Sequence, residues 1–275
     1  MKTQSITKEG IVGYNLTEEE FGVLKYLDSR IFVDSAIERF TGWHSSFDSN
    51  HPDWKDRVEV QRALARSISA AIELNLDRLK KLPKIKIIFL GASLGSIATF
   101  FTLRYFKHHK LLDKVDLTIY DLLLEPLERT KCGDFDMSVN AIEDCGNPQN
   151  INENEYKKCL STANICAGNI TDIQLPDDEY DFTIAPFVQH HLNIYDKQKS
   201  CQEMQRITAE NGFIGIGDLC FNHEQFNIWL KRHKEEKVSY AMESFISLEE
   251  HISIFKHADV IDKRSGDFYY VFCMS

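Results

Sequence analysis

The 275-residue sequence lacks the patterns typical of several protein classes. Seven cysteines are present, but none has Cys-x-x-Cys spacing, so neither a zinc site nor a disulfide framework is indicated. No apolar run approaches the roughly 20 residues that span a bilayer, and the first ten residues lack the apolar core of a secretion signal. A formal net charge of −10 leaves few of the clustered Lys and Arg side chains that bind nucleic-acid backbones. We therefore expect a cytoplasmic protein with reduced thiols and with neither nucleic acid nor membrane as a partner.

Phosphate-binding and covalent-catalysis patterns are also missing. No lysine stands between Lys86 and Lys107, which excludes the Gly-Lys-Ser/Thr ending of a triphosphate-binding loop. No Ser/His/Asp or Cys/His arrangement supports a covalent mechanism, and no cluster of ligating side chains indicates a metal.

What the sequence does contain is a regular alternation of strand-like and helix-like segments. Short apolar runs predict strands at residues 84–90, 115–121, 162–168, 179–187 and 211–219, and a terminal hairpin around 264–267. Helical patterns lie between them. Strand, helix and strand in regular turn predict a parallel sheet that is covered on both faces, and hence an α/β protein.

The first part of the chain reads as helical. Thr17 and Glu20 have the spacing of a capping box, which predicts that a helix begins there. A second, longer helix is predicted from Trp54 to Pro83, because apolar residues recur every four positions and form one stripe. The stripe consists of Val60, Leu64, Ile68, Ile72 and Leu76.

These patterns predict a division of the chain into two parts. Residues 1–82 would form a helical N-terminal extension and residues 83–275 the α/β domain. Within the latter, residues 132–161 are polar and rich in Asn and Glu, which indicates an insertion or a long irregular connection. The extension is rich in aromatic residues, which could form either a lid over a small organic acceptor or the core of a helical subdomain. They are Tyr14, Phe21, Tyr26, Phe32, Phe40, Trp43, His44 and Trp54.

The glycine loop in "FLGASLGSIATFF" (residues 89–101) comes directly after the first predicted strand. A dinucleotide loop has glycine at its first, third and sixth positions, and here only Gly91 fits, since Ser93 and Ser96 occupy the other two. Glycines at the first, third and fifth positions fit better, because Gly91 and Gly95 match and Ser93 is small. The loop thus fits this third spacing better than either phosphate-binding pattern.

This loop and three later segments resemble the class I, Rossmann-like methyltransferases that depend on S-adenosyl-L-methionine. The strand "LTIYD" ends at Asp121, and "AGNITDIQLPDDEYDFTIAPFVQHHL" and "ITAENGFIGIGD" resemble later motifs of that family in order and spacing. The resemblance covers roughly residues 84–219. It implies a doubly wound, mostly parallel seven-stranded sheet with a C-terminal antiparallel hairpin and an N-terminal helical extension. It also implies S-adenosyl-L-methionine as the cofactor and transfer of a methyl group to oxygen or nitrogen of a small-molecule acceptor.

The resemblance assigns roles to individual positions. Asp121 would accept hydrogen bonds from the two ribose hydroxyls, Asn169 falls on the adenine-contacting acid, and residues 186–189 would line the cofactor beside its sulfonium. The complete set of implied cofactor contacts is Gly91, Ala92, Ser93, Gly95, Asp121, Leu122, Asn169, Ile170, Pro186, Phe187 and Gln189. His190 and His191 follow the fourth predicted strand, where an imidazole could accept a proton from the acceptor.

The sequence departs from the family pattern in two places. Phe89 stands where the family often has an acid for the cofactor's ammonium group, and the interval from Gly91 to Asp121 exceeds the roughly 20 residues usual for such a crossover. The Asn/Asp-Pro-Pro-Tyr/Phe signature of adenine methylation is also absent, because "IAPFVQ" stands in its place. This disfavours a nucleic-acid base as the acceptor.

Simpler interpretations remain open for the same residues. The two loop glycines could serve a tight turn beside a ligand that is not a nucleoside, Asp121 could cap the next helix, and Asn169 could be a turn residue. One of the two adjacent histidines could point into helix packing. At the level of function, the alternatives are another reaction with the same cofactor and a catalytically inactive, partner-binding subunit.

Overall fold

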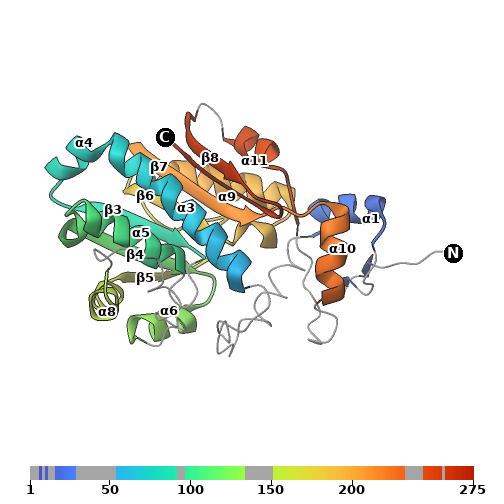
Figure 1. The fold of residues 1–275 in the computed structure, drawn as a ribbon, viewed down its shortest axis with the longest axis horizontal. Helices are drawn as coiled ribbons and strands as arrows, with labels where there is room; N and C mark the ends of the chain where they lie inside the picture. The colour runs from blue at the N-terminus through green and yellow to red at the C-terminus, as the bar shows by residue number, and fades with distance from the viewer. Residues whose placement is uncertain are drawn as a thin grey trace.

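The computed structural model describes residues 6–7, 10–11, 16–28, 54–91, 97–133, 151–232, 244–255 and 258–275. Its centre is a seven-stranded sheet with the order β5-β4-β3-β6-β7-β9-β8 (Figure 1). The strands are β3 (Ile85–Leu90), β4 (Val115–Asp121), β5 (Asn164–Ala167), β6 (Tyr180–Pro186), β7 (Thr208–Leu219), β8 (Val260–Ser265) and β9 (Tyr269–Met274). Strands β3 to β7 pair in parallel, and the hairpin β8–β9 joins β7 antiparallel. The predicted fold class is confirmed.

The central strands are apolar almost throughout, as strands buried on both faces must be. In β3 five of the six residues are buried. Strand β3 lies between β4 and β6, so the chain winds outward first on one side of β3 and then on the other. The carboxyl ends of β3 and β6 therefore mark a topological switch point, where open α/β sheets bind their ligands.

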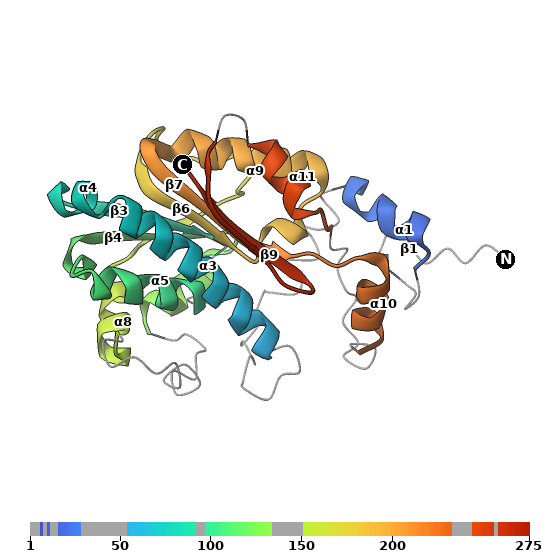
Figure 2. The ribbon, with the colours of Figure 1, turned by 45° about the horizontal axis from the view of Figure 1, so that its top comes forward.

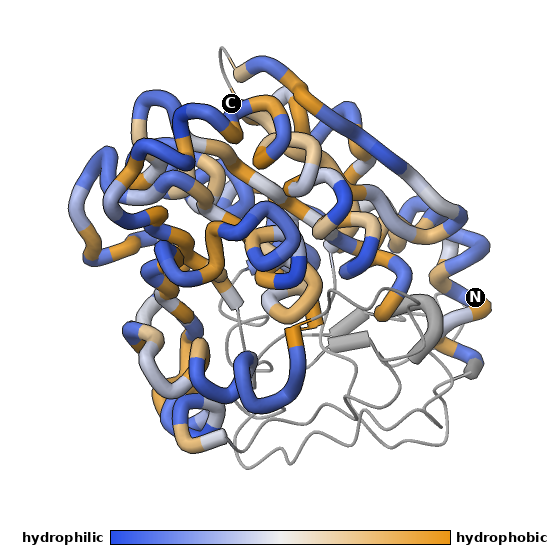
Figure 3. Tube along the Cα trace, turned by 60° about the vertical axis from the view of Figure 1, so that its left-hand side comes forward, coloured by the Kyte–Doolittle hydropathy of each residue, from blue (hydrophilic) through white to orange (hydrophobic). Residues whose placement is uncertain are grey.

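Helices cover both faces of the sheet. Helices α3 (Trp54–Leu74), α5 (Ile97–His108) and α8 (Glu153–Ser161) share one hydrophobic core with one face, whereas α9 (Ile194–Ile207) and α11 (Leu248–Ile254) share a second core with the other. Figure 3 shows apolar and polar residues alternating along the helices, as expected for helices with one buried side. The shorter elements are α4 (Leu76–Lys81), α6 (Leu124–Lys131), η2 (Leu112–Lys114), η3 (Gln189–His191) and the hairpin β1 (Ile6–Thr7)–β2 (Gly10–Ile11).

Helix α3 is part of the same core as the sheet. Leu64 and Ile68 of the predicted stripe are completely buried, and they pack so closely on β7 that a Cβ at Gly215 or Gly217 would lie 3.1–3.2 Å from them. The helix ends at Leu74 and not just before Pro83, and α4 begins after a single residue, Asn75. The division of the chain after residue 82 remains a prediction, and this packing shows that α3 contributes to the α/β core.

A smaller third core lies at one end of the sheet, where α1 (Glu18–Val23) packs beside α10 (His223–Arg232) (Figure 2). Helix α1 begins with the predicted capping box, because Thr17 Oγ1 accepts from the Glu20 amide and Glu20 accepts from the Thr17 amide. The buried residues of this core are Leu16, Leu24, Phe226, Trp229, Leu230 and Phe245.

The prediction of an irregular connection at residues 132–161 is wrong for its last part, which forms α8. A capping box between Asn152 and Glu155 begins the helix, and Tyr156 and Leu160, one turn apart, are completely buried. Tyr156 packs edge-on against Phe100 of α5, with ring centroids 5.2 Å apart. The apolar stripe is only two residues long, so the polar composition concealed it.

Candidate functional site

Most of the predicted cofactor contacts follow the carboxyl ends of four neighbouring strands. Gly91 follows β3, Asp121 ends β4, Asn169 follows β5 and Pro186 ends β6. Because these strands are parallel and adjacent, all four positions meet at the same edge of the sheet. Ala92, Ser93 and Gly95 lie outside the described residues, so their predicted roles stay predictions.

Gly91 occupies a position that only glycine fits. Its φ of +72° is in the left-handed region, and a Cβ there would lie 2.7 Å from both Cβ and Cγ2 of Val188. Its amide donates to the Tyr120 carbonyl at 2.8 Å, so the turn is held by β4 while it touches the loop after β6. The glycine therefore brings the loops after β3 and β6 into direct contact at the switch point.

Asp121 places a half-buried carboxylate at the end of β4, beside the equally half-buried Leu122. Its Oδ1 accepts from the Leu123 amide at 3.3 Å, an Asx-type turn, and Leu123 is the N-cap of α6. The alternative that Asp121 caps this helix is therefore wrong. The Asp121 carbonyl accepts from the Gly168 amide at 2.9 Å, which ties the ends of β4 and β5 together.

The turn after β5 brings Asn169 to the surface and buries Ile170. Oδ1 of Asn169 accepts from both the amide and the hydroxyl of Thr171, each at 2.9 Å, so Asn169 is at least a turn residue. Ile170 is 6% exposed and belongs to the core. Gly168 is needed here, because a Cβ would lie 2.2 Å from Oη of Tyr120.

The loop after β6 has an unusual backbone. Phe187 has a φ of +53°, which is rare for a residue other than glycine, and its amide donates to the Gly217 carbonyl at 2.8 Å. Pro186 is buried and Phe187 is half-buried. Gln189, predicted to line the cofactor, instead turns its completely buried amide toward α9, where Nε2 donates to Ser200 Oγ at 2.9 Å. The η3 turn sends this side chain inward.

His190 forms a buried pair with Asp218 near the end of β7. Nδ1 of His190 lies 2.5 Å from Oδ1 of Asp218, and the two side chains are 6% and 1% exposed. Burial alone would raise the pKa of Asp218, but its charge interaction and hydrogen bond with His190 outweigh burial and lower it. The carboxylate is therefore ionised at neutral pH and accepts the Nδ1 proton. His191 is half-buried, with its ring centroid 4.0 Å from that of His190.

Asp218 and a buried lysine are the site residues that the sequence analysis missed. Lys197 of α9 is 1% exposed, and its Nζ donates to the Leu192 carbonyl at 2.5 Å and to the carbonyl and hydroxyl of Ser244 at 2.7 and 3.2 Å. Burial lowers the pKa of Lys197 to about 7, although Asp218 acts in the opposite direction. The Ser244 amide donates to the His190 carbonyl at 2.8 Å. Hydrogen bonds with Lys197 and His190 thus hold Ser244, the first residue of the described segment 244–255, at the edge of the sheet.

A second buried histidine, His251 of α11, lies close enough to Asp218 to feel its charge. Nδ1 of His251 is 2.5 Å from Oη of Tyr270, and its Nε2 is 3.5 Å from Sγ of Cys201. Burial lowers the pKa of His251 to about 3, so the imidazole is neutral at physiological pH. Burial also raises the pKa values of Tyr270 and Cys201, which keeps both of them protonated.

The described part of the chain has no helix long and apolar enough to cross a membrane. It also contains no group of three or more His, Cys, Asp or Glu side chains arranged to hold a metal ion.

Comparison with known proteins adds independent information. A family model described as "Methyltransferase domain" matches residues 123–216, from the start of α6 into β7. The match therefore includes Asn169, the residues 186–189 and both histidines. No curated protein matches the chain.

Among solved structures, the chain is similar to the N-methyltransferase NodS from Bradyrhizobium japonicum WM9 in complex with S-adenosyl-L-homocysteine. The two sequences are 12% identical and the TM-score is 0.49, and the alignment covers 89% of this chain and 97% of NodS. PH0226 from Pyrococcus horikoshii OT3 is 13% identical with a TM-score of 0.48, covering 87% and 97%. A SAM-dependent methyltransferase from Aquifex aeolicus is 16% identical with a TM-score of 0.42, covering 74% and 87%.

Proposed function

We propose that this chain is a Rossmann-like methyltransferase that uses S-adenosyl-L-methionine to methylate an oxygen or nitrogen atom of a small-molecule acceptor, and the match of residues 123–216 to a methyltransferase-domain model supports this. The family match supports the enzyme class predicted from the sequence. The acceptor type is our proposal. The observation that supports it is the meeting of Gly91, Asp121 and the His190–Asp218 pair at one edge of the sheet.

The residues at this edge have the chemistry that the cofactor requires. Asp121 offers a carboxylate that can accept hydrogen bonds from both ribose hydroxyls. Gly91 has no side chain, so the backbone at this position can pass close to the cofactor. Because Oδ1 of Asn169 already accepts two hydrogen bonds, we assign its amide nitrogen to the adenine ring. Phe187 and Pro186 line the loop nearest the sulfonium in this proposal. Ala92, Ser93 and Gly95 would complete the cradle, as the family resemblance implies.

S-Adenosylmethionine, when bound, supplies an electrophilic methyl group on a positively charged sulfur. The residues around the site would have to hold the acceptor's lone pair in line with that methyl group. An acceptor that carries a proton must also lose it. In the neutral imidazole, Asp218 favours the tautomer with the proton on Nδ1 of His190, which leaves the lone pair of Nε2 to accept the acceptor's proton.

Titration calorimetry with S-adenosylmethionine and S-adenosylhomocysteine tests the cofactor site directly. We expect both to bind, and binding of neither would overturn the proposal. Mass spectrometry of a reaction with a candidate acceptor tests the chemistry. A methyltransferase leaves an acceptor heavier by one methylene group, whereas any other reaction with the same cofactor leaves a different product.

The described cysteines support a cytoplasmic location for this activity. All six of them are free thiols, namely Cys132, Cys159, Cys166, Cys201, Cys220 and Cys273. Reduced cysteines are usual in the cytosol and uncommon in secreted proteins.

A further inference from the structure

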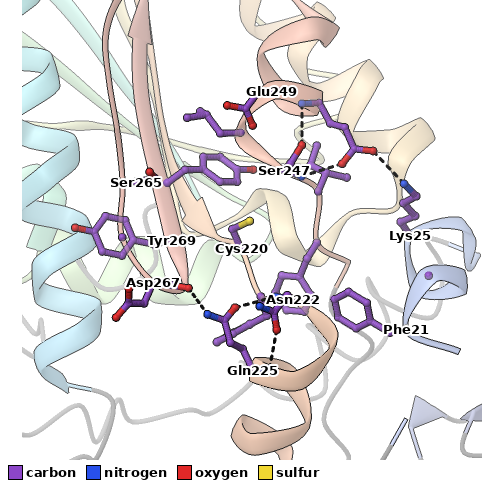
Figure 4. A pocket seen from close by; sticks show the side chains of 18 residues that line it. Phe21, Lys25, Cys220, Asn222, Gln225, Ser247, Glu249, Ser265, Asp267 and Tyr269 are labelled. Atoms are coloured by element: carbon purple, nitrogen blue, oxygen red, sulfur yellow. Dashed lines mark hydrogen bonds and ion pairs between the residues drawn. The ribbon is translucent and has the colours of Figure 1, made fainter. Parts of the chain in front are cut away.

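A cavity of about 500 Å³ lies beyond the end of β7, outside the predicted cofactor contacts (Figure 4). Its walls come from α1, from the segment between β7 and α10, from the start of α11 and from the β8–β9 turn. A cavity of this volume is large enough for a small organic molecule. None of Gly91, Asp121 and Asn169 lines it.

The cavity adjoins the His190–Asp218 pair. Cys220, on its wall, is two residues from Asp218, and Tyr270, also on its wall, pairs with Asp218 across β7 and β9. Phe245 lines it as well and follows Ser244, whose amide donates to the His190 carbonyl. Along the sheet edge the order is therefore cofactor loops, then the His190–Asp218 pair, then the cavity.

Aromatic rings form much of the cavity wall. Phe21 of α1 stacks on Phe245 with ring centroids 6.2 Å apart and planes at 12°, and Phe221 meets Phe245 edge-on at 5.2 Å. Tyr269, at the start of β9, is also a lining residue, but its ring packs against the core that α3 shares with the sheet. Rings in this arrangement favour an apolar body in the ligand, and their faces also attract a cation.

The charges on the cavity wall favour a cation. The only basic residue among the described lining residues is Lys25, and its Nζ is already paired with Glu250 at 3.1 Å. Glu249 and Asp267 also line the cavity, both are exposed, and neither forms an ion pair with any described residue. Among its described lining residues, the cavity therefore has two carboxylates without an ion pair and no unpaired cation to receive an anionic group.

We propose that this cavity is the acceptor site and that the acceptor is an organic amine, whose positive charge is complemented by the Glu249 and Asp267 carboxylates of the cavity wall and whose apolar body lies among Phe21, Phe221 and Phe245. The proposal rests on the methyltransferase function above and adds to it the class of the acceptor. It accounts for a ring-lined cavity on the far side of the His190–Asp218 pair from the cofactor loops.

Two probes with the same ring system and opposite charge test the proposal. Tryptamine and indole-3-propionate are titrated calorimetrically into the full chain, with and without saturating S-adenosylhomocysteine. We expect tryptamine to bind roughly tenfold more tightly than indole-3-propionate, from two exposed carboxylates that each contribute a weak ion pair. Equal affinities, tighter binding of the acid, or binding of neither probe would overturn the proposal.

A charge-neutral double variant locates the binding. Glu249→Gln with Asp267→Asn keeps the shape of the cavity, and we expect it to abolish the tenfold preference for tryptamine. The matched control is Asp113→Asn with Glu210→Gln, two exposed acids without ion pairs among the described residues and outside the cavity. If the control loses the preference to the same extent, the cavity is not the site. S-Adenosylhomocysteine binding is measured on the same samples, so failure of the cofactor site is seen separately from failure of the amine site.

Discussion

Nδ1 of His190 lies 2.5 Å from Oδ1 of Asp218, and the two side chains are buried together between the ends of β6 and β7. The same oxygen of Asp218 also accepts from the Leu219 amide at 2.8 Å, so two donors hold the carboxylate in place through Oδ1. An ionised, fixed acceptor at Nδ1 decides which imidazole tautomer is present. This arrangement makes His190 a candidate base, whereas the sequence alone also allowed a histidine that only packs against a helix.

Replacing Asp218 by Asn tests whether the pair takes part in methyl transfer. The amide can donate as well as accept, so it no longer fixes the proton on Nδ1. With an acceptor that must lose a proton, we expect kcat to fall by about 100-fold, the usual contribution of a positioned base, while KM for S-adenosylmethionine stays unchanged. The measurement is steady-state kinetics from pH 6 to 9.

The control for this variant is Asp196→Asn, which neutralises another buried acid, near the start of α9. It should keep the kcat and the pH profile of the native enzyme. A lower melting temperature for Asp218→Asn with an unchanged kcat and pH profile would show that the pair is only structural.

Asp121→Ala separates a cofactor-binding enzyme from a partner-binding scaffold with the same fold. Loss of the carboxylate leaves the ribose hydroxyls without their acceptors, which costs about 1–3 kcal/mol, or roughly 5- to 150-fold in affinity for S-adenosylhomocysteine. Calorimetry gives the affinity. Asp113→Ala, which removes an exposed acid from η2, should leave it unchanged. A scaffold without a cofactor site would show no effect of either substitution.

Gly91→Ala should destabilise the protein and weaken cofactor binding for two separable reasons. The new Cβ would meet Val188 at 2.7 Å, and the φ of +72° is strained for alanine by about 1–2 kcal/mol. Adding Val188→Gly removes the clash but not the strain, so the two substitutions together should destabilise less than the sum of their separate effects.

Urea unfolding of the single and double variants measures this coupling. Gly22→Ala is the matched control, because a Cβ added at this position inside helix α1 would have no atom within 4 Å. It should stabilise by roughly 0.5–1 kcal/mol, the advantage of alanine over glycine in a helix. Strict additivity of Gly91→Ala and Val188→Gly would contradict the contact between the two loops.

The parts of the fold that could be predicted are those with a local cause. Apolar runs mark β3, β4 and β6, and the parallel arrangement then brings Gly91 and Asp121 to one edge without any knowledge of side-chain contacts. Helix α8 was missed although Asn152 and Glu155 have the same capping spacing as Thr17 and Glu20, because its apolar stripe is too short to stand out.

The buried polar groups could not be predicted, because their partners are far away in the sequence. Asp218 is 28 residues from His190, and Ser244 is 47 residues from Lys197. A lysine in a polar helix such as α9 reads as a surface residue, since lysine is rarely buried unless its ammonium is satisfied. One acceptor of Lys197, the Leu192 carbonyl, is local, but the other two come from Ser244.

Lys197 should make stability depend on pH above neutrality. Its pKa is lowered to about 7 in the folded protein, whereas an unfolded lysine titrates near 10.4. Between these values the unfolded chain binds more protons, so the free energy of unfolding rises with pH, by about 1 kcal/mol per pH unit.

We expect this rise in the difference between the native protein and Lys197→Met, measured by urea unfolding from pH 7.0 to 8.5. The difference between the native protein and Lys199→Met should stay constant over the same range, because Lys199 on the same helix is exposed and forms only a surface ion pair with Asp196. A constant difference for Lys197→Met would contradict a buried lysine of lowered pKa.

His251 should produce a separate loss of stability on the acid side. Its pKa is lowered to about 3 in the folded protein and is near 6.5 in the unfolded chain, so between these values only the unfolded chain takes up a proton. Stability is therefore lost as pH falls below about 6.5, by about 1 kcal/mol per pH unit. The groups around His251 do not offset this loss, since Tyr270 and Cys201 stay protonated and the lowered pKa of Asp218 keeps it ionised.

His251→Gln should reduce this acid slope between pH 6.5 and 5.0, because glutamine can bond Tyr270 but takes up no proton. Urea unfolding at intervals of half a pH unit gives the slope. An unchanged slope in His251→Gln would mean that His251 is already protonated in the folded protein, with its ring held by a charge and not by the hydroxyl of Tyr270.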